Sequence, residues 1–170
     1  DTTETYECWQ LALENLNSPS VLALTRQKLN PIRKEFLKEN KCSFGAYEIS
    51  RSNQDVKVTI IATGSEVNLA LEVSHKLATE NIYSKVISVP CQELFKQQSD
   101  SYKDKILNET EFTITIEAGS TSCWQKYIVN KGLNFGIDDF GKSAPYKKIY
   151  EYFNLTSNSI AKKVKKMINR

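Results

Sequence analysis

The amino-acid sequence predicts an α/β protein built on an open, mostly parallel sheet with helices on both faces. Short apolar runs of strand length recur along the chain, and helically spaced apolar residues follow them, as in residues 56–62 followed by residues 66–79. Turn-forming residues such as Gly64 and Pro90 separate these segments. Alternation of this kind is typical of parallel strands joined by crossover helices. We therefore expect a mixed, Rossmann-like domain of three layers.

Residues 4–17 are the first predicted helix. Asp1 and Glu4 have the spacing of a capping box at its start, and Pro19 prevents its continuation. Spacings of three, four and three place four apolar residues on one face, namely Tyr6, Trp9, Leu13 and Leu16. The chain does not begin with Met, and its first residue already fits a helix cap. We therefore expect it to be a piece of a longer protein or a processed product.

Residues 21–25 form a continuous apolar run, which predicts a strand buried on both faces. Residues 27–44 are polar and charged and include Pro31, which indicates a linker with room for one short helix. We therefore expect residues 1–26 to be the tail of one domain and residues 45–170 to be a second domain.

The second domain shows the alternation most clearly. Strands are predicted at residues 56–62, 83–89, 112–117 and 133–137. Helices are predicted at residues 66–79, 92–96, 122–130, 147–153 and 157–168. The helix at 66–79 is expected to turn six residues inward, namely Val67, Ala70, Leu71, Ser74, Leu77 and Ala78. His75 is expected on its outward side.

Charge and hydropathy argue against nucleic acid or a membrane as partners. The net charge is only +3, and the basic residues gather at 162–170, where they suit a helix C-terminus. A nucleic-acid interface would show a basic face with interleaved aromatic residues. The longest apolar runs are far shorter than the ~20 residues of a membrane helix, and the polar N-terminus does not resemble a signal peptide.

The cysteines and the histidine limit the chemistry that this chain can carry. Cys8, Cys42, Cys91 and Cys123 are widely spaced, so no CxxC pair exists for zinc or redox work. Thiols without a disulfide pattern are typical of a reducing compartment, and we expect a cytoplasmic protein. His75 is the only histidine, which leaves little for a histidine-based metal site or a catalytic triad.

Two segments follow predicted strands at the edge where open α/β sheets bind ligands. Residues 63–66 form a strand-to-helix turn in which Thr63 and Glu66 fit a capping box. This turn could hold an anion, although a purely structural role is favoured, because it has neither a lysine nor a glycine-rich fingerprint. Arg26 follows the predicted strand at 21–25 and suits a phosphate or carboxylate. From its position alone, a solvated loop arginine is an equal alternative.

Three acidic residues are weaker candidates. Glu117 ends a strand, but a single carboxylate without a partner is poor support for a general base. Asp138 and Asp139 are adjacent in a loop, and neighbouring side chains diverge, so a magnesium site is not favoured. A turn with Gly141 at an unusual backbone angle is the preferred interpretation.

Six segments, in order, resemble the C-terminal portion of transketolases. They are LALTRQKL at residues 22–29, GAY at 45–47, IATGSEV at 61–67, VISVPCQELF at 86–95, EAG followed by WQKY at 117–127, and GIDDFGKSAP at 136–145. The third segment contains the family's ATGSEV, and the last resembles its GIDRFGASAP. Each segment is short, but together they cover essentially the whole chain.

The resemblance implies an enzyme that moves a two-carbon ketol unit from a ketose phosphate to an aldose phosphate. Thiamine diphosphate would carry the carbanion, and Mg²⁺ or Ca²⁺ would hold its diphosphate. In this family an N-terminal domain binds both, and the middle domain of the other subunit of a homodimer supplies the activating glutamate. The resemblance therefore implies that residues 1–26 end the middle domain, that residues 45–170 are the C-terminal domain, and that this chain alone is inactive.

Arg26 is the one family site residue that the resemblance assigns to this chain, as a ligand of the substrate phosphate. No catalytic, cofactor-binding or metal-binding residue is assigned. Three positions depart from the family pattern, since Thr25 replaces Ser, Lys28 replaces Asn and Asp139 replaces Arg. Lys28 adds a charge beside Arg26, and Asp139 removes any role of the loop arginine.

Two alternatives remain open at this point. The chain could be a free-standing, non-catalytic α/β binding or assembly module. It could also belong to another thiamine enzyme, such as a ketoacid dehydrogenase β-subunit or a deoxyxylulose-phosphate synthase. The Arg26 segment and residues 136–145 favour transketolase over the other thiamine enzymes.

Overall fold

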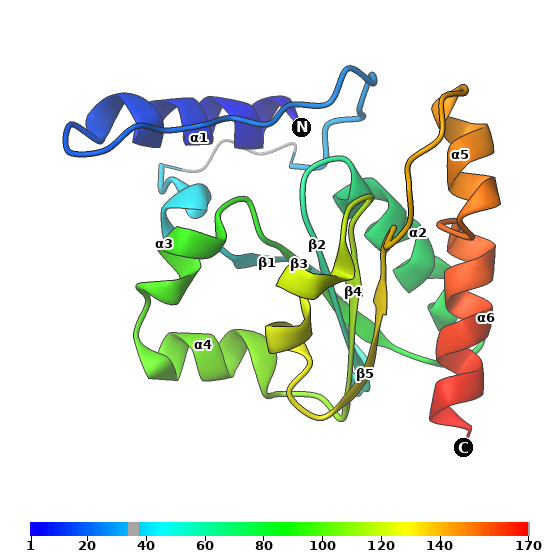
Figure 1. Ribbon diagram of the computed structural model, residues 1–170. Helices are drawn as coiled ribbons and strands as arrows, with labels where there is room; N and C mark the ends of the chain where they lie inside the picture. The colour runs from blue at the N-terminus through cyan, green and yellow to red at the C-terminus, as the bar shows by residue number, and fades with distance from the viewer. Residues whose placement is uncertain (34–37, 170) are drawn as a thin grey trace.

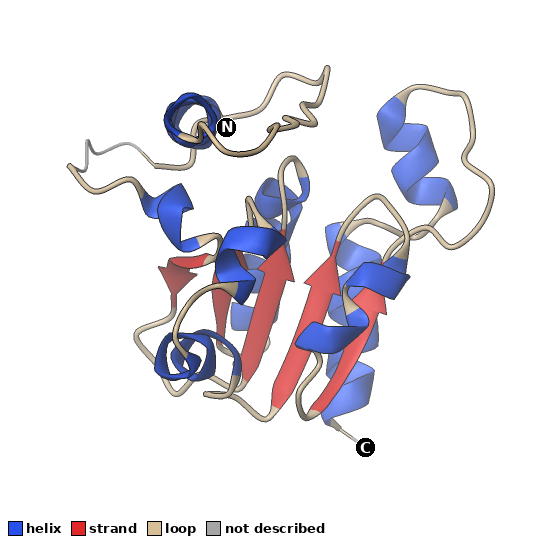
Figure 2. Ribbon diagram, turned by 60° about the vertical axis from the view of Figure 1, so that its left-hand side comes forward, coloured by secondary structure: helices blue, strands red, loops and turns tan. Residues whose placement is uncertain are grey.

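The protein folds around a five-stranded sheet with the strand order β1-β3-β2-β4-β5. The computed structural model describes residues 1–33 and 38–169 (Figures 1 and 2). The strands are β1 (Tyr47–Arg51), β2 (Val58–Ala62), β3 (Ser84–Ser88), β4 (Phe112–Ile116) and β5 (Lys131–Phe135). Only β1 is antiparallel to its neighbour, and the other three pairings are parallel. The predicted mixed, mostly parallel sheet is confirmed.

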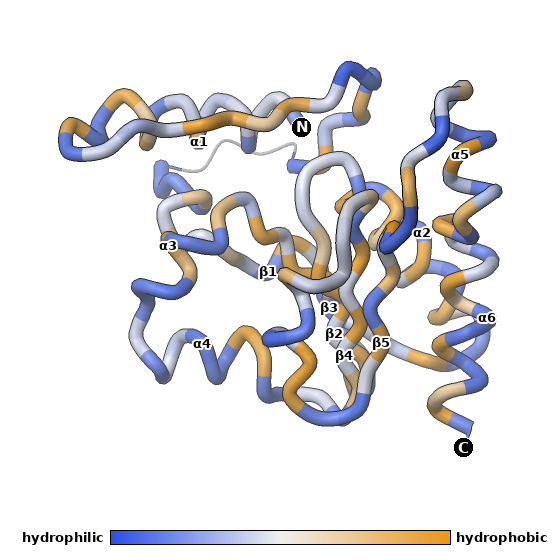
Figure 3. Tube along the Cα trace, in the orientation of Figure 1, coloured by the Kyte–Doolittle hydropathy of each residue, from blue (hydrophilic) through white to orange (hydrophobic). Residues whose placement is uncertain are grey.

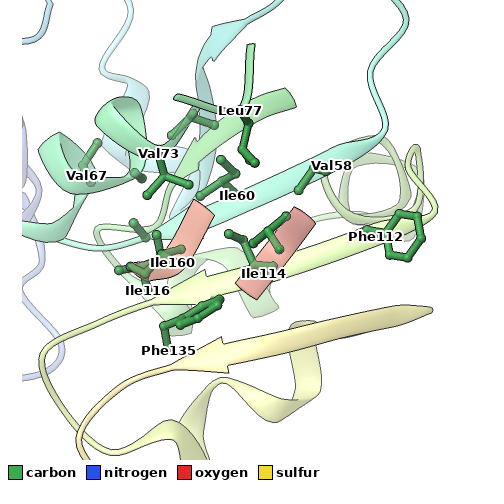
Figure 4. Close-up of a cluster of buried hydrophobic side chains, with 14 of the residues drawn as sticks. Val58, Ile60, Val67, Val73, Leu77, Phe112, Ile114, Ile116, Phe135 and Ile160 are labelled. Carbon is green, nitrogen blue, oxygen red and sulfur yellow. The ribbon is translucent and has the colours of Figure 1, made fainter. Parts of the chain in front are cut away.

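Helices cover both faces of the sheet, because its three central strands are apolar on both sides. Every residue of β2, β3 and β4 is buried, and successive side chains point to opposite faces. Ile60 packs with α2 (Glu66–Ala78) and α6 (Ser157–Ile168) on one face (Figure 4). Ile61 packs on the other face, where α3 (Gln92–Lys96) and α4 (Asp100–Leu107) lie. The three-layer arrangement follows from this alternation, and Figure 3 shows hydrophobic residues concentrated along the strands.

Helix predictions succeeded where apolar periodicity was strong. The helices at 92–96 and 157–168 match α3 and α6, and those at 66–79 and 147–153 match α2 and α5 (Tyr146–Tyr152) within one residue. Along α2, Val67, Ala70 and Leu77 are buried, as predicted, Leu71 and Ser74 are half-buried, and His75 is exposed. Val73 is also buried although it was not predicted to be, and Ala78 is exposed, contrary to prediction.

The predicted helix at 122–130 is wrong. Two single 3₁₀ turns, η2 (Thr121–Cys123) and η3 (Gln125–Tyr127), replace it. The indole N–H of Trp124 donates to the carboxylate of Glu117, which fastens the segment to the end of β4. Only a few residues then remain before β5, which is too short a stretch for a regular helix. The sequence interpretation also missed α4 and the edge strand β1.

The first helix, α1 (Thr2–Glu14), forms as predicted, but its apolar face does not pack against the described part of the chain. Asp1 caps it by accepting a hydrogen bond from the backbone N–H of Glu4 at 3.0 Å. The predicted apolar residues are exposed, namely Tyr6 by 69%, Trp9 by 49%, Leu13 by 72% and Leu16, which lies beyond the helix, by 89%. We call Tyr6, Trp9 and Leu13 the outer face of α1.

Helix α1 contacts the rest of the protein through two buried carboxylates. Glu4 accepts hydrogen bonds from the hydroxyl of Tyr47, at 2.8 Å, and from that of Ser88. Glu7 forms an ion pair with Arg33 at 2.8 Å and accepts a hydrogen bond from the backbone N–H of Cys42 at 3.1 Å. Burial raises the pKa of Glu7, but the bonds from Arg33 and Cys42 outweigh it and leave the pKa below its usual value. The helix is therefore held in a defined orientation by its polar side.

The predicted buried strand at 21–25 is also wrong. These residues are extended but belong to no strand, and Val21 and Leu24 are 92% and 59% exposed. A strand needs a neighbour that takes its backbone hydrogen bonds, and no described strand lies beside this segment. The linker predicted at 27–44 includes a short 3₁₀ turn, η1 (Lys41–Phe44), while its residues 34–37 lie outside the described residues.

Candidate functional site

The candidate site is a groove at the carboxyl edge of the parallel strands. The segments that follow β2, β4 and β5 meet there, as the alternating topology requires. The groove has a volume of about 440 Å³. Its lining comprises Ala23, Leu24, Thr25 and Gln27 from the extended segment, Ser65 and Glu66 from the β2–α2 turn, Ala118, and Ile137, Gly141, Lys142, Tyr146, Ile149, Tyr150 and Phe153 near and within α5. The segment before Arg26 therefore packs against the second domain at this edge.

A larger depression of about 640 Å³ lies at the opposite, amino edge of the sheet. It is bordered by the residues that lead into β2, β4 and β5, including Lys57, Glu111 and Lys131. The ammonium of Lys131 is already paired with Glu111 at 2.9 Å, and both side chains are mostly exposed. Ligands of open α/β sheets bind at the carboxyl edge, so the smaller groove is the better candidate.

Arg26 lies at the rim of this groove. It is exposed, and its neighbours Thr25 and Gln27 line the groove. The Thr25 hydroxyl accepts a hydrogen bond from the backbone N–H of Gln27 at 3.2 Å, which closes a tight turn around Arg26. Within residues 1–33 and 38–169, the guanidinium makes no hydrogen bond or ion pair. Its charge is therefore available to an anion, although the strand expected to precede it does not form.

The most polar contact inside the groove joins α2 to α5. The carboxylate of Glu66, which is 5% exposed, accepts hydrogen bonds from the hydroxyl of Tyr150 and, at 2.8 Å, from that of Ser65. Burial raises the pKa of Tyr150, and the adjacent Glu66, which accepts the phenol hydrogen, raises it further. The phenol thus remains protonated and keeps donating to Glu66 at neutral pH.

The capping box predicted for Thr63 and Glu66 is wrong. The Thr63 hydroxyl donates to the carbonyl of Val89 at 2.8 Å, which ties the ends of two neighbouring strands together. The helix α2 begins after Ser65 without a side-chain cap. Glu66 points instead to Tyr150, which is 84 residues away in the sequence. Local spacing carries no signal for such a partner.

The weaker acidic candidates have structural partners. Glu117 binds the Trp124 indole. Asp138 accepts from the backbone N–H and the hydroxyl of Thr121, at 2.8 and 2.6 Å, and these hydrogen bonds lower the pKa of Asp138. Asp139 accepts from the backbone N–H of Phe140 at 2.7 Å. The unusual backbone angle expected at Gly141 is wrong, because the glycines with positive φ are Gly45 and Gly64.

No described part of the chain brings together three or more His, Cys, Asp or Glu residues in a way that could hold a metal ion. None of the described helices is long and apolar enough to cross a membrane. All four cysteines are free thiols. Within the described residues, the groove is thus a mainly structural junction with one unpaired arginine, Arg26, at its rim.

The fold and this groove indicate the class of protein, which is a three-layer α/β domain with a polar junction at the carboxyl edge of its sheet. Comparison with known proteins then gives the family. The family model described as the transketolase-like TK C-terminal domain matches residues 45–156. The transketolase of Sinorhizobium medicae is 37% identical over 171 residues, which are 100% of this chain and 24% of that protein. This chain therefore belongs to the transketolase family and corresponds to its C-terminal portion.

Solved structures agree with this assignment. A transketolase from Leishmania mexicana superimposes with a TM-score of 0.89 at 32% identity, over 100% of this chain and 24% of that one. A Pichia stipitis transketolase solved in complex with sedoheptulose-7-phosphate has a TM-score of 0.88 at 31% identity, over 99% of this chain and 24% of that one. The chain thus spans about a quarter of the length of the relatives that it matches.

Proposed function

We propose that the full-length protein is a transketolase that transfers a two-carbon ketol unit from a ketose phosphate to an aldose phosphate. The proposal rests on the similarity to transketolases over essentially the whole chain. Thiamine diphosphate with Mg²⁺ or Ca²⁺ would supply the carbanion chemistry when bound. The active form would be a homodimer in the cytoplasm. A relative from Pichia stipitis has been solved with a sugar phosphate, which agrees with this substrate class.

The residues described here do not fit the cofactor or its metal. They contain no cluster of metal ligands, and the only histidine, His75, lies on the outer surface of α2. The diphosphate and the metal would therefore bind to parts of the full-length protein beyond this chain. We infer that the 170-residue chain has no ketol transfer activity of its own.

The chain divides into residues 1–26, a linker at residues 27–44, and a domain at residues 45–170. In this proposal residues 1–26 complete a preceding, pyrimidine-binding domain. Two observations support it. The outer face of α1 is apolar but exposed, and the segment at 21–25 is extended but has no strand beside it. Both features suit elements whose packing partners lie in the rest of the full-length protein.

Arg26 would bind the phosphate of the sugar substrate. The resemblance of residues 22–29 to transketolases implies this role, and the exposed guanidinium, unpaired within the described residues and flanked by residues that line the groove, supports it. A guanidinium can hold a phosphate through two parallel hydrogen bonds. The phosphate is remote from the reacting carbonyl, so holding it would help to orient the sugar over the cofactor.

Arg26→Ala in the full-length protein tests this role. We expect KM for the sugar phosphates to rise about tenfold to a hundredfold, the cost of a lost charged hydrogen bond. The affinity for thiamine diphosphate should not change. The control is Lys162→Ala, which removes an exposed cation from α6 and should leave both values unchanged. Equal losses of substrate and cofactor affinity would contradict the role of Arg26. Ketol transfer by the 170-residue chain alone would contradict the proposal that this chain is inactive without the rest of the protein.

A further inference from the structure

We propose that Glu66 and Tyr150 are positioning residues that hold the Arg26 turn in place for the substrate phosphate. The inference rests on the proposed function and deepens it, because it gives the C-terminal domain a defined task. The two residues come from α2 and α5, and neither is expected to touch the substrate. They act on Arg26 through Gln27.

The hydroxyl of Tyr150 on α5 donates to Glu66 on α2, and this pair lies in the groove beside the Arg26 turn. The phenol of Tyr150 has one hydrogen, and it is donated to Glu66. Gln27 lines the same groove as Tyr150 and Glu66, so a phenol fixed by Glu66 gives the Arg26 turn a defined surface to lie against. A second hydroxyl, from Ser65 at 2.8 Å, donates to the same oxygen of Glu66, Oε1. The phenol of Tyr150 must be protonated to donate to Glu66, and burial beside Glu66 favours the protonated form by raising the pKa of Tyr150.

Gln27 is the residue through which the pair of Glu66 and Tyr150 would fix the position of Arg26. It is half-buried, whereas its neighbours Arg26 and Lys28 are exposed. Arg26 and Gln27 lie in a bend in which Gln27 is turned towards the groove and Arg26 is exposed. The Thr25 hydroxyl, which accepts from the backbone N–H of Gln27 at 3.2 Å, keeps the turn tight.

The turn has little else to hold it within the described chain. Residues 21–25 pair with no described strand, so backbone hydrogen bonds of a sheet do not fix their position there. Side-chain contacts in the groove, which Thr25, Gln27, Glu66 and Tyr150 share, hold the turn on the side of residues 45–170. Loss of the Tyr150 hydroxyl would therefore loosen the turn without changing the fold of the sheet.

The test uses the full-length enzyme with Tyr150→Phe, which keeps the ring and removes the hydrogen bond to Glu66. The control is Tyr152→Phe on the same helix, where the side chain is 62% exposed. Each enzyme is assayed with an aldose phosphate and with the unphosphorylated aldose of the same length. We expect Tyr150→Phe to raise KM for the aldose phosphate about three- to tenfold, the effect of one net hydrogen bond. We expect kcat, the kinetics with the unphosphorylated aldose, and the control enzyme to remain unchanged.

Two further measurements separate the possible outcomes. In an Arg26→Ala background, Tyr150→Phe should add nothing to KM, because the positioned group is gone. Amide hydrogen exchange of residues 21–27 should be faster in Tyr150→Phe than in the parent. An equal loss with both aldoses, an additive effect in the double variant, or unchanged exchange would overturn the inference. If Arg26→Ala raises KM and Tyr150→Phe does not, the positioning fails and the proposed function stands. If Arg26→Ala itself has no effect, the phosphate role of Arg26 fails as well.

Discussion

The outer face of α1 permits a prediction with opposite outcomes in two forms of the protein. Leu13 is 72% exposed in this chain, so Leu13→Ala should change the free energy of unfolding of the 170-residue chain by less than about 0.5 kcal/mol. If the full-length protein covers this face, burial of the remaining three quarters of the side chain contributes about 1–2 kcal/mol. The cavity left by the substitution adds to this, and we expect a total loss of about 2–3 kcal/mol.

Urea unfolding of both forms, with matched variants, measures this difference. Leu77→Ala serves as the control, because Leu77 is 1% exposed and packs in the core of this chain. It should cost about 2–5 kcal/mol in both forms. Leu13→Ala should lower the urea midpoint of the full-length protein only. A full-length protein that tolerates Leu13→Ala as well as the short chain does would refute the proposal that residues 1–26 complete a preceding domain.

Two further predictions concern the second domain itself. Glu109 binds the fully buried ammonium of Lys85 at 2.8 Å, and the pKa of Glu109 is lowered to about 2, first by the Arg51 hydrogen bond and then by that of Lys85. Its contribution is present above the usual pKa of 4.5 and is lost as the pH falls towards 2, so Glu109→Gln should destabilise the chain by about 1 kcal/mol at pH 7 and by less in urea titrations at pH 3. Gly45 has φ +72°, and a Cβ there would lie 2.1 Å from the backbone nitrogen of Phe95. Gly45→Ala should therefore cost at least about 2 kcal/mol in thermal unfolding, whereas Gly141→Ala, with open space around it, should be almost neutral.

The elements predicted best from the sequence are those whose conformation is determined by their own local pattern of apolar residues. Strands β2, β3 and β4 are short apolar runs, and each of their residues is buried. Helix α6 presents Ile160 and Val164 at helical spacing, and the predicted bounds agree with the structure. By contrast, β1 lies at the sheet edge with a mixed burial pattern, and α4 buries only Ile106. Weak patterns of this kind do not distinguish a short element from a loop.

The errors have a different cause, because they concern segments whose conformation depends on distant partners. The apolar run at 21–25 resembles a buried strand, but the sequence cannot show whether a neighbouring strand is present. The candidate site divides in the same way. Arg26 was predicted to follow a strand at residues 21–25, and that strand does not form. Arg26 lies instead between two residues that line the groove of the five-stranded sheet, and its phosphate role stays a prediction. Glu66 and Tyr150 are 84 positions apart in the sequence, and no local motif predicts that they form a hydrogen bond.

Residues 1–26 lie against residues 45–170 at two places, and each place includes a buried carboxylate. Glu4 of α1 meets Tyr47 and Ser88, which face each other across β1 and β3 at the carboxyl edge. Glu66 binds Tyr150 beside the Arg26 turn at the same edge. Apolar contacts tolerate sliding, whereas hydrogen bonds to a buried carboxylate hold only in one geometry. In the proposed enzyme, residues 45–170 would thus serve the active site by fixing the orientation of the preceding segment, which would give Arg26 the support that a precisely placed group needs.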